Sequence, residues 1–530
     1  MRPIPPLPEL PAPEQRPAWV EAVLQVVAAQ AEQIHQLQQE AQALRDEVAR
    51  LKRQKPKPPI GPSRLREGEG KARGGKGAVQ GRSPPKIDKT VVVKAEDVPE
   101  GSRFKGYSDY VVRELVIQSQ TTLYRVEKWL TPEGKLVTGQ VPVPLPTEGP
   151  GDHFGPTLRS FTLYQYYHAQ VTEPLILEQL REWGMQISSG QLHALITDGK
   201  EQFHREKDEI LRVGLRLSGH IHVDDTGARH QGKNGYVTHI GNEWFAWFQT
   251  TESKSRINFL QLLRAGHTDY VLNGEALEYA AAQKLPHEPL EKLAAASGSV
   301  FADERAWQVA LRSCGIVDQR HVRIATEGAL LGSALEHGVN PQMAIMSDDA
   351  GQFNVLCHAL CWIHAERVLA KLVGFNDSQR QDLEQVRSKV WQLYRDIKDY
   401  QRSPTSEAKR ALEDRFDALC ATKTRFASLK LALQRMHRNK RELLLVLERP
   451  DLPLHNNLSE GDIREYVKRR KISGGTRSDD GRRGRDTFAS LKKTCRKLGI
   501  SFWTYLNDRI VGAQLIPPLP ALIEARALPP

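Results

Sequence analysis

Cysteine and long apolar runs are scarce in this chain of 530 residues, and each scarcity excludes a class of protein. The five cysteines, none of them before Cys314, are too few for a disulfide scaffold and fit a reducing cytosol. No apolar run reaches the ~18 residues that a membrane helix needs. The first seventeen residues contain seven prolines and no apolar core, unlike a secretory signal. We therefore expect a cytoplasmic protein with no membrane partner.

Positive charge is in excess and is concentrated in two segments. The net charge is +11. Residues 52–89 hold twelve Lys and Arg against three acids, and residues 464–497 hold thirteen against four, so the rest of the chain is acidic on balance. Basic segments on an acidic body are typical of proteins that bind phosphates. The sequence therefore predicts a polyanionic partner.

The N-terminal part predicts an oligomerisation element between disordered segments. Residues 1–17 are proline-rich and expected to be disordered. Residues 18–54 carry a heptad repeat with mostly Val and Ile at a and mostly Leu at d, which favours a parallel two-stranded coiled coil and hence a homodimer or higher oligomer. The alternative is a helix packed on its own chain. Residues 55–89 predict a disordered basic linker, either a tether or a DNA-contacting arm.

Two small regions follow the linker. Residues 90–150 contain the β-like runs YVVRELVIQ and TTLYRVEKWLTPEGKLVTG and predict a small β region. Residues 151–216 predict short helices. Within them, ILEQLREWG, a turn through Gly184, and SGQLHALIT capped by Ser188 or Ser189 have the spacing of a helix-turn-helix. That spacing favours a DNA-binding unit and a purely structural helical unit equally.

From residue 217 to about residue 510 the pattern predicts an α/β domain. Strand-like runs HIHVDD, NGYVTHIGN and EWFAWFQTT precede the helical RINFLQLLRAG, and a fourth strand, MAIMSDD, precedes a helical region from about His358 to Glu448. A last helix begins around Leu458. This order is typical of a ribonuclease-H-like core with helical insertions. Residues 511–530 are expected to form a tail.

Acidic residues stand at the edges of the predicted elements. Asp224 and Asp225 end one strand, Asp348 and Asp349 end another, and Glu460 begins the last helix. Carboxylates held at strand ends face a crevice in which their oxygens can share a hard cation. Three such groups, together with phosphate oxygens, suffice for two Mg²⁺ ions. Each carboxylate alone is more often a turn or cap residue, so the prediction depends on their combination.

A second group that could bind metal is Cys357, Cys361 and His364. On one helix, their spacing of four and three residues would place all three on a single face. No fourth ligand accompanies them, and a free cysteine is a good small core residue. We favour core packing, with His364 near the active site.

The order of these motifs resembles a known family. HVDDTGAR, MSDDAGQF, CWIHAERVLAKL and NNLSEGDIREYVKRRKISGG together resemble the insertion-sequence-sixty-six transposases, which are DDE recombinases, over about residues 90–510. The resemblance implies that Asp224, Asp348 and Glu460 are catalytic and bind two Mg²⁺ or Mn²⁺ ions. Residues expected to support the site are Asp225, Asp349, His364, Asn456 and Asn457.

The resemblance also implies a function. It predicts a bacterial, nucleoid-associated transposase that cuts double-stranded DNA at the ends of a mobile element and joins the 3′-hydroxyls to target DNA by transesterification. Small accessory transposition proteins are further implied partners. Alternatives are a ribonuclease-H-like nuclease or resolvase without strand transfer, and an inactive DNA-binding dimer. The residues expected to grip the DNA backbone are Arg464, Lys468, Arg469, Arg470 and Lys471.

This chain departs from the family at three places. Family members often carry a Cys₄ zinc ribbon before the core, whereas this chain has no cysteine there, so no zinc is expected and packing must replace the metal in residues 90–150. The long gap from Asp224 to Asp348 predicts an insertion around residues 267–340. Gly461 stands where the family usually has Arg.

Overall fold

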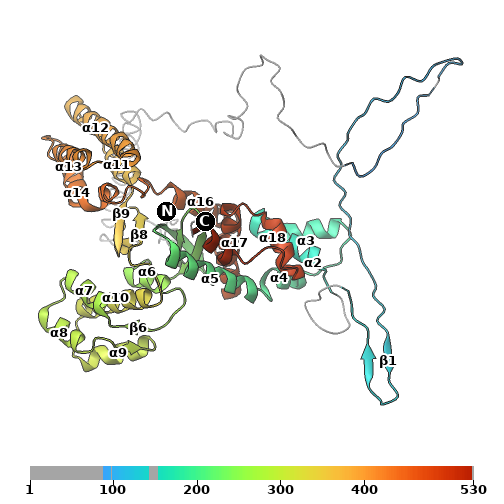
Figure 1. Ribbon diagram of the computed structural model, residues 1–530, viewed down its shortest axis with the longest axis horizontal. Helices are drawn as coiled ribbons and strands as arrows, with labels where there is room; N and C mark the ends of the chain where they lie inside the picture. Colours follow the sequence, from blue (N-terminus) through green and yellow to red (C-terminus); the bar gives the residue numbers. More distant parts are fainter. Residues whose placement is uncertain (1–86, 97, 143–152, 528–530) are drawn as a thin grey trace, which may run out of the picture. The chain divides into compact units, whose positions relative to one another are not determined.

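The computed structural model describes residues 87–96, 98–142 and 153–527 (Figure 1). The chain divides into two units, residues 1–115 and 116–530. The proline-rich start, the predicted coiled coil over residues 18–54 and nearly all of the predicted linker lie outside the described residues, so these remain predictions. Within the described ranges, no helix has the length and apolar character needed to span a bilayer.

The first β-like run, YVVRELVIQ, forms no strand. In the described part of residues 98–142, strands are confined to β1 (Lys128–Leu130) and β2 (Leu136–Thr138), which pair antiparallel around the predicted Pro-Glu-Gly turn. The prediction for the first run is wrong because strand propensity reflects packing on neighbouring elements. Its side chains pack on nothing described: Val112, Leu115 and Val116 are each about four-fifths exposed.

Five helical segments follow, and the predicted cap is confirmed. Ser188 accepts a hydrogen bond from the backbone N–H of Gln191, whose side chain accepts one from the Ser188 backbone, which is a complete capping box. Tyr167 stacks on Phe488 with ring centroids 4.2 Å apart, so these helices share a core with the C-terminal part of the chain. The segments are α2 (Pro156–Leu163), a π-helical turn (Tyr164–His168), α3 (Glu173–Glu182), α4 (Ser189–Thr197) and α5 (Glu201–Leu217).

A mixed five-stranded sheet forms the centre of the α/β region. Its strand order is β5-β4-β3-β8-β9, in which β3 to β5 are antiparallel and β8 and β9 run parallel to β3. The four predicted strands are confirmed. The strands are β3 (His220–His230), β4 (Lys233–Gly241), β5 (Ala246–Thr251), β8 (Ala344–Ser347) and β9 (Cys357–Leu360).

Strand β9 corrects the prediction that a helical region begins at about His358. The helix α11 (Trp362–Ala370) begins only after the strand has ended. A run of four mostly apolar or small residues fits a buried parallel strand as well as a helix, and periodicity cannot separate the two. For the same reason Cys357, Cys361 and His364 do not share a helix face: they lie in β9, at the cap of α11 and inside α11.

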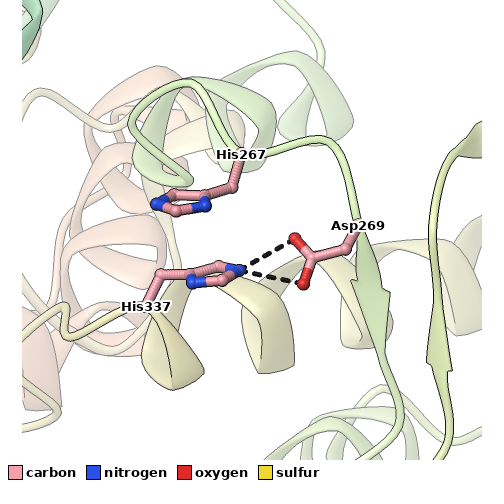
Figure 2. A group of neighbouring side chains, drawn as sticks. All are labelled: His267, Asp269 and His337. Carbon is pink, nitrogen blue, oxygen red and sulfur yellow. Dashed lines mark hydrogen bonds and ion pairs between the residues drawn. The ribbon is translucent and has the colours of Figure 1, made fainter.

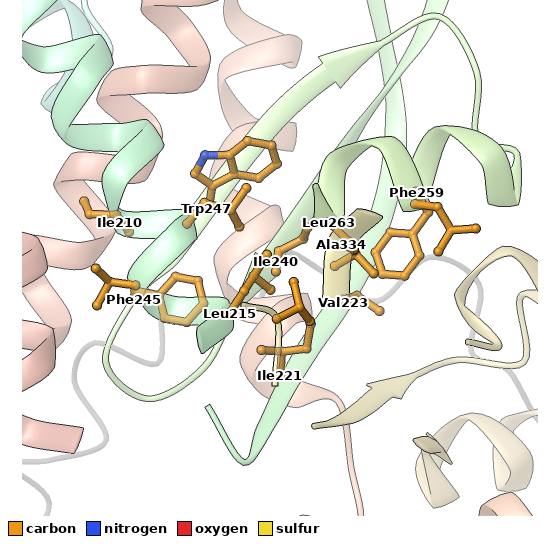
Figure 3. Close-up of a cluster of buried hydrophobic side chains, with 14 of the residues drawn as sticks. Ile210, Leu215, Ile221, Val223, Ile240, Phe245, Trp247, Phe259, Leu263 and Ala334 are labelled. Atoms are coloured by element: carbon orange, nitrogen blue, oxygen red, sulfur yellow. The ribbon is translucent and has the colours of Figure 1, made fainter. Parts of the chain in front are cut away.

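Both faces of the sheet are covered by helices. On one face, Ile221, Val223 and Ile240 pack with side chains from α5, α6 (Arg256–Leu263) and α10 (Gln319–Glu336) (Figure 3). On the other, Phe248 and Val237 pack against α16 (Asn457–Ser473) and α17 (Asp479–Lys497). Successive residues of β3 therefore point into different layers, as the period of a strand requires.

The insertion is predicted in the chain between α6 and β8. This part of the chain is mostly helical and shares the core of the first face of the sheet. Its elements before α10 are β6 (Tyr270–Val271), α7 (Gly274–Ala282), α8 (His287–Ala295), β7 (Val300–Phe301) and α9 (Glu304–Ser313).

A second group of helices follows β9 and has a hydrophobic core of its own. Trp362 at the start of α11 is buried in it, and its indole N–H donates to the Leu443 carbonyl at 2.8 Å. Besides α11, the group consists of α12 (Asp377–Arg402), α13 (Ser406–Cys420), α14 (Ala427–Arg438) and α15 (Lys440–Leu443).

The C-terminal end is part of the fold. After α18 (Phe502–Val511), the expected tail contains α19 (Leu519–Ala527), whose Leu519 and Ile523 are completely buried. The backbone N–H of Leu519 donates to Glu206 of α5 at 2.9 Å. The prediction of a tail was wrong because prolines before the helix obscured its two apolar anchors.

Candidate active site

The sheet register brings Asp224 and Asp348 level with each other. His222 of β3 lies opposite Met346 of β8 in the parallel pair. Asp224 stands two residues after His222, and Asp348 stands two residues after Met346. Side chains two residues apart share a face, so both carboxylates lie on the face that α16 covers. Asp348 directly follows β8, as predicted. Asp224 lies in the middle of β3 rather than at its end, because β3 continues to His230.

The start of α16 is fastened to the same strand. The Asn456 side chain donates to the Val223 carbonyl at 2.8 Å, and its oxygen lies 2.9 Å from His222 Nδ1. Ser459 Oγ lies 2.7 Å from Nδ1 of His239, which is the residue opposite Asp224 on β4. These contacts hold the first turn of α16, and with it Glu460, over β3.

The three carboxylates are near enough to influence one another electrostatically. Burial first, and then the charges of Asp348, Asp225 and Glu460, raise the pKa of Asp224 to about 7. The backbone N–H of Asp225 donates to Asp224 Oδ1 at 2.8 Å, and this hydrogen bond partly offsets the rise in the pKa of Asp224. A buried carboxyl among like charges favours the neutral form. A cation placed among them would reverse that preference.

The two other acidic candidates have partners of their own. Asp225 accepts a hydrogen bond from the Gln352 amide at 2.7 Å. Asp349 accepts one from Arg435 Nε of α14 at 2.5 Å. Asp225 follows Asp224 directly, and Asp349 follows Asp348 directly. Neighbouring residues of an extended chain point in different directions, so Asp225 and Asp349 do not share the direction of Asp224 and Asp348. The structure thus separates Asp224 and Asp348 from their sequence neighbours.

Helix α11 supplies two basic groups to Glu460. Arg367 Nη1 donates to Glu460 Oε1 at 2.9 Å, and His364 Nε2 lies 3.5 Å from the same oxygen. His364 therefore lies beside the site, where we expected it. Arg367 was not among the predicted site residues, although its position three residues after His364 places both on one helix face. The shared motif CWIHAER was the signal that could have revealed it.

The supporting candidates differ in what they do. Cys361 is buried, and its sulfur accepts a hydrogen bond from the Asn456 backbone N–H at 3.2 Å, which fits the favoured packing role. Asn456 is 1% exposed and its side chain is hydrogen-bonded to β3, so it holds the start of α16 in place beside the site. Asn457 is the exposed first residue of α16.

The predicted DNA-contacting residues of α16 fall into two groups. Arg464, Lys468 and Lys471 are exposed. Arg469 is 7% exposed, and its guanidinium lies over the Tyr166 ring at 4.1 Å. Arg470 donates to the Gly227 carbonyl, a contact within the protein. We therefore retain only the exposed group as candidates for phosphate contacts.

Much of the second basic segment is neutralised internally. Lys492 and Lys493 of α17 are buried and pair with Glu465 at 2.5 and 2.8 Å, while Lys497 pairs with Asp462 at 2.9 Å. Burial alone would raise the pKa of Glu465, but the two lysines outweigh it and lower the pKa to about 2. The positive charge of residues 464–497 is therefore not all available to DNA.

Comparison with known proteins gives two matches. The model of the Transposase IS66 family matches residues 338–483, a range that contains Asp348, the motif of α11 and Glu460. An uncharacterized protein of Sinorhizobium fredii is 45% identical over 321 residues, which cover 60% of this chain and 100% of that protein.

Proposed function

The chain belongs to the IS66 family of transposases, and we propose that it cuts phosphodiester bonds at the ends of a mobile DNA element and joins the 3′-hydroxyls to target DNA. The family supports a transposase that acts on DNA. The observation that carries the finer proposal is the level placement of Asp224 and Asp348 on parallel strands with Glu460 above them.

The sheet supports a ribonuclease-H-like core for this chemistry. Three antiparallel strands followed by a fourth strand match the order expected from the sequence; this fourth strand, β8, runs parallel to β3, and β9 adds a parallel strand that was not expected. The first part of β3 pairs with β8, which sets Asp224 and Asp348 side by side, and a helix can bring a third carboxylate to them.

The site fits divalent cations of the Mg²⁺ or Mn²⁺ kind. Its donors are carboxylate oxygens, which these ions prefer. Mutual repulsion among them, seen in the raised pKa of Asp224, is what a cation would relieve. We propose that Asp224, Asp348 and Glu460 hold two such ions. When bound, the pair would stabilise the attacking and leaving oxygens of an in-line displacement.

The protein's own groups would position the site and the DNA. Asn456 and Ser459 hold α16 against β3 and β4, which keeps the third carboxylate facing the other two. Arg367 orients Glu460. The exposed cations Arg464, Lys468 and Lys471 follow on the same helix and would contact backbone phosphates, giving position without reading sequence.

Product analysis tests the proposal. Full-length protein would be incubated with labelled DNA carrying the native element ends, a target plasmid and Mg²⁺. We expect nicked ends first and joined products later. Cleavage without joined products would favour the nuclease alternative. DNA binding without Mg²⁺-dependent cleavage would favour the inactive dimer and overturn the proposal.

A further inference from the structure

The side chains of His267, Asp269 and His337, which are of the kinds that bind metal ions, lie close together (Figure 2). None of the three belongs to the candidate active site. One ligand atom from each lies within 4.8 Å of the other two. His337 Nε2 is 2.9 Å from both oxygens of Asp269. The rings of His267 and His337 stack with centroids 3.5 Å apart and planes 7° from parallel.

The surroundings fix the Asp269 carboxylate. The buried Ser333 hydroxyl, one turn before His337 on α10, donates to Asp269 Oδ1 at 2.9 Å. Arg264 donates to the Asp269 backbone carbonyl at 2.6 Å, and its own carbonyl accepts from the His267 N–H at 3.1 Å. Hydrogen bonds that orient a ligating carboxylate are typical of metal sites.

We propose that His267, Asp269 and His337 bind a divalent transition-metal ion of the zinc class. Two imidazoles and a carboxylate suit zinc, and three protein ligands leave a position for water. Zinc bonds of about 2.0–2.2 Å in a tetrahedral site place ligand atoms roughly 3.2–3.6 Å apart. Binding requires the pair of His337 and Asp269 to open by roughly half an ångström. Their side chains are 27% and 18% exposed, which leaves room for that adjustment. One imidazole must also rotate, because the nitrogen lone pairs of two stacked, nearly parallel rings do not point at one ion.

A simple ion pair does not account for the arrangement. His337 alone contacts both oxygens of Asp269, so an ion pair with this carboxylate gives no role to His267. The second imidazole lies flat against the first, and two protonated rings so close would repel each other. A metal ion would use both imidazoles in their neutral form together with the carboxylate.

The position gives the ion a structural role. His267 and Asp269 follow α6, where the chain leaves the sheet for the insertion, and His337 caps α10, from which the chain returns to β8. An ion there ties the two ends of the inserted region together. This proposal revises the expectation that the protein needs no zinc, because that expectation considered only groups that contain cysteine.

Zinc binding to the full-length protein tests the proposal independently of transposition. The triple variant Asp224→Asn, Asp348→Asn and Glu460→Gln removes the competing carboxylates, and equilibrium dialysis then measures Zn²⁺ bound. We expect one equivalent to remain. Adding His267→Gln or His337→Gln should weaken its binding at least about tenfold. The matched control His321→Gln alters a histidine that also lies on α10 and faces an aspartate, at 3.8 Å, and should bind as before.

A spectroscopic measurement guards against misfolded variants. Co²⁺ added to the carboxylate-free protein with both histidines intact should give the visible spectrum of a four- or five-coordinate site with nitrogen ligands. Zn²⁺ should also raise its unfolding temperature by mass action, and the histidine variants should lose that rise. Absence of a bound equivalent in the carboxylate-free protein, or unchanged binding by both histidine variants, would overturn the proposal.

Discussion

Arg367 grips Glu460 with two nitrogens of its guanidinium: Nη1 lies 2.9 Å from Oε1 and Nη2 lies 3.4 Å from Oε2. The arginine comes from α11 and the glutamate from α16, so the pair joins the second helical group to the sheet. A two-pronged contact fixes the plane of a carboxylate as well as its charge. The pair can thus set the direction in which Glu460 presents its oxygens.

Replacing Arg367 should therefore reduce cleavage. Loss of the contact would free Glu460 to rotate, while loss of a nearby positive charge would favour cation binding. The Arg367 side chain is 46% exposed, so water screens its charge and orientation should dominate. We expect Arg367→Ala to lower the cleavage rate by about 10–100-fold and to raise the Mg²⁺ concentration at half-maximal rate. Magnesium titrations of cleavage measure both.

Arg435→Ala is the matched control, since Arg435 makes a similar exposed pair with Asp349. Its cleavage rate should stay near that of the wild type. Equal losses in the two variants would contradict a specific role for Arg367.

Removing any one of the three carboxylates should abolish cleavage but spare DNA binding. We expect Asp224→Asn, Asp348→Asn and Glu460→Gln each to lower cleavage by at least about 100-fold, because each removes a proposed cation ligand and no phosphate contact. Gel assays of cleavage and fluorescence anisotropy of DNA binding separate the two effects. Asp349→Asn is the control that should still cleave. Normal cleavage by the Asp348 variant would move the site to Asp349.

Asp224 should make a contribution to the stability of the metal-free protein that falls as pH rises from about 4 to 7, opposite in sign to that of buried histidines such as His222, whose pKa burial lowers to about 3. The folded-state pKa of Asp224 is raised to about 7, mainly by burial, above its ordinary value of 3.8. The folded state therefore holds a proton that the unfolded state has already released, and stability falls wherever the folded state binds more protons. Thermal unfolding in EDTA across this range measures the slope. Asp224→Asn should make the slope of stability against pH more positive than that of the wild type, and a wild-type slope in that variant would refute the assignment.

How far the sequence predicted this protein depended on the range of the interactions involved. Local signals such as the Ser188 cap and the strand that ends at Ser347 were identified correctly, because a few neighbouring residues determine them. Strand β9 was missed because only its parallel partner β8 distinguishes it from a helix. The buried charges of Lys492 and Lys493 were counted as surface charge, since their partner Glu465 is contacted only after folding.

The proposed oligomer depends on the heptads of residues 18–54. Replacing Leu37 and Leu44 at d positions with Gln would put polar groups into the predicted seam, which should weaken a two-stranded coil. We expect the sedimentation mass to shift toward the monomer at micromolar concentration. Substitution of two residues outside the seam, Gln36 and Gln39, by Glu serves as the control. An unchanged mass in the Leu variant would place the oligomer interface elsewhere.

Exposed and buried cations of α16 should affect DNA binding in different ways. Lys468 and Lys471 are exposed, so Lys468→Gln with Lys471→Gln should weaken binding to element ends and to unrelated DNA alike. Each phosphate contact contributes about 0.9 to the slope of log affinity against log salt, so the double variant should flatten that slope by up to roughly 1.8. The unfolding temperature of this double variant should not change.

Arg469→Gln removes a guanidinium packed on Tyr166 and should instead lower the unfolding temperature while leaving the salt slope as it was. Fluorescence anisotropy across a salt series, with thermal unfolding in parallel, measures both quantities. If Arg469→Gln flattened the slope and the lysine variant did not, DNA would have to reach the side of α16 that now packs on Tyr166, and the proposed phosphate path would be wrong.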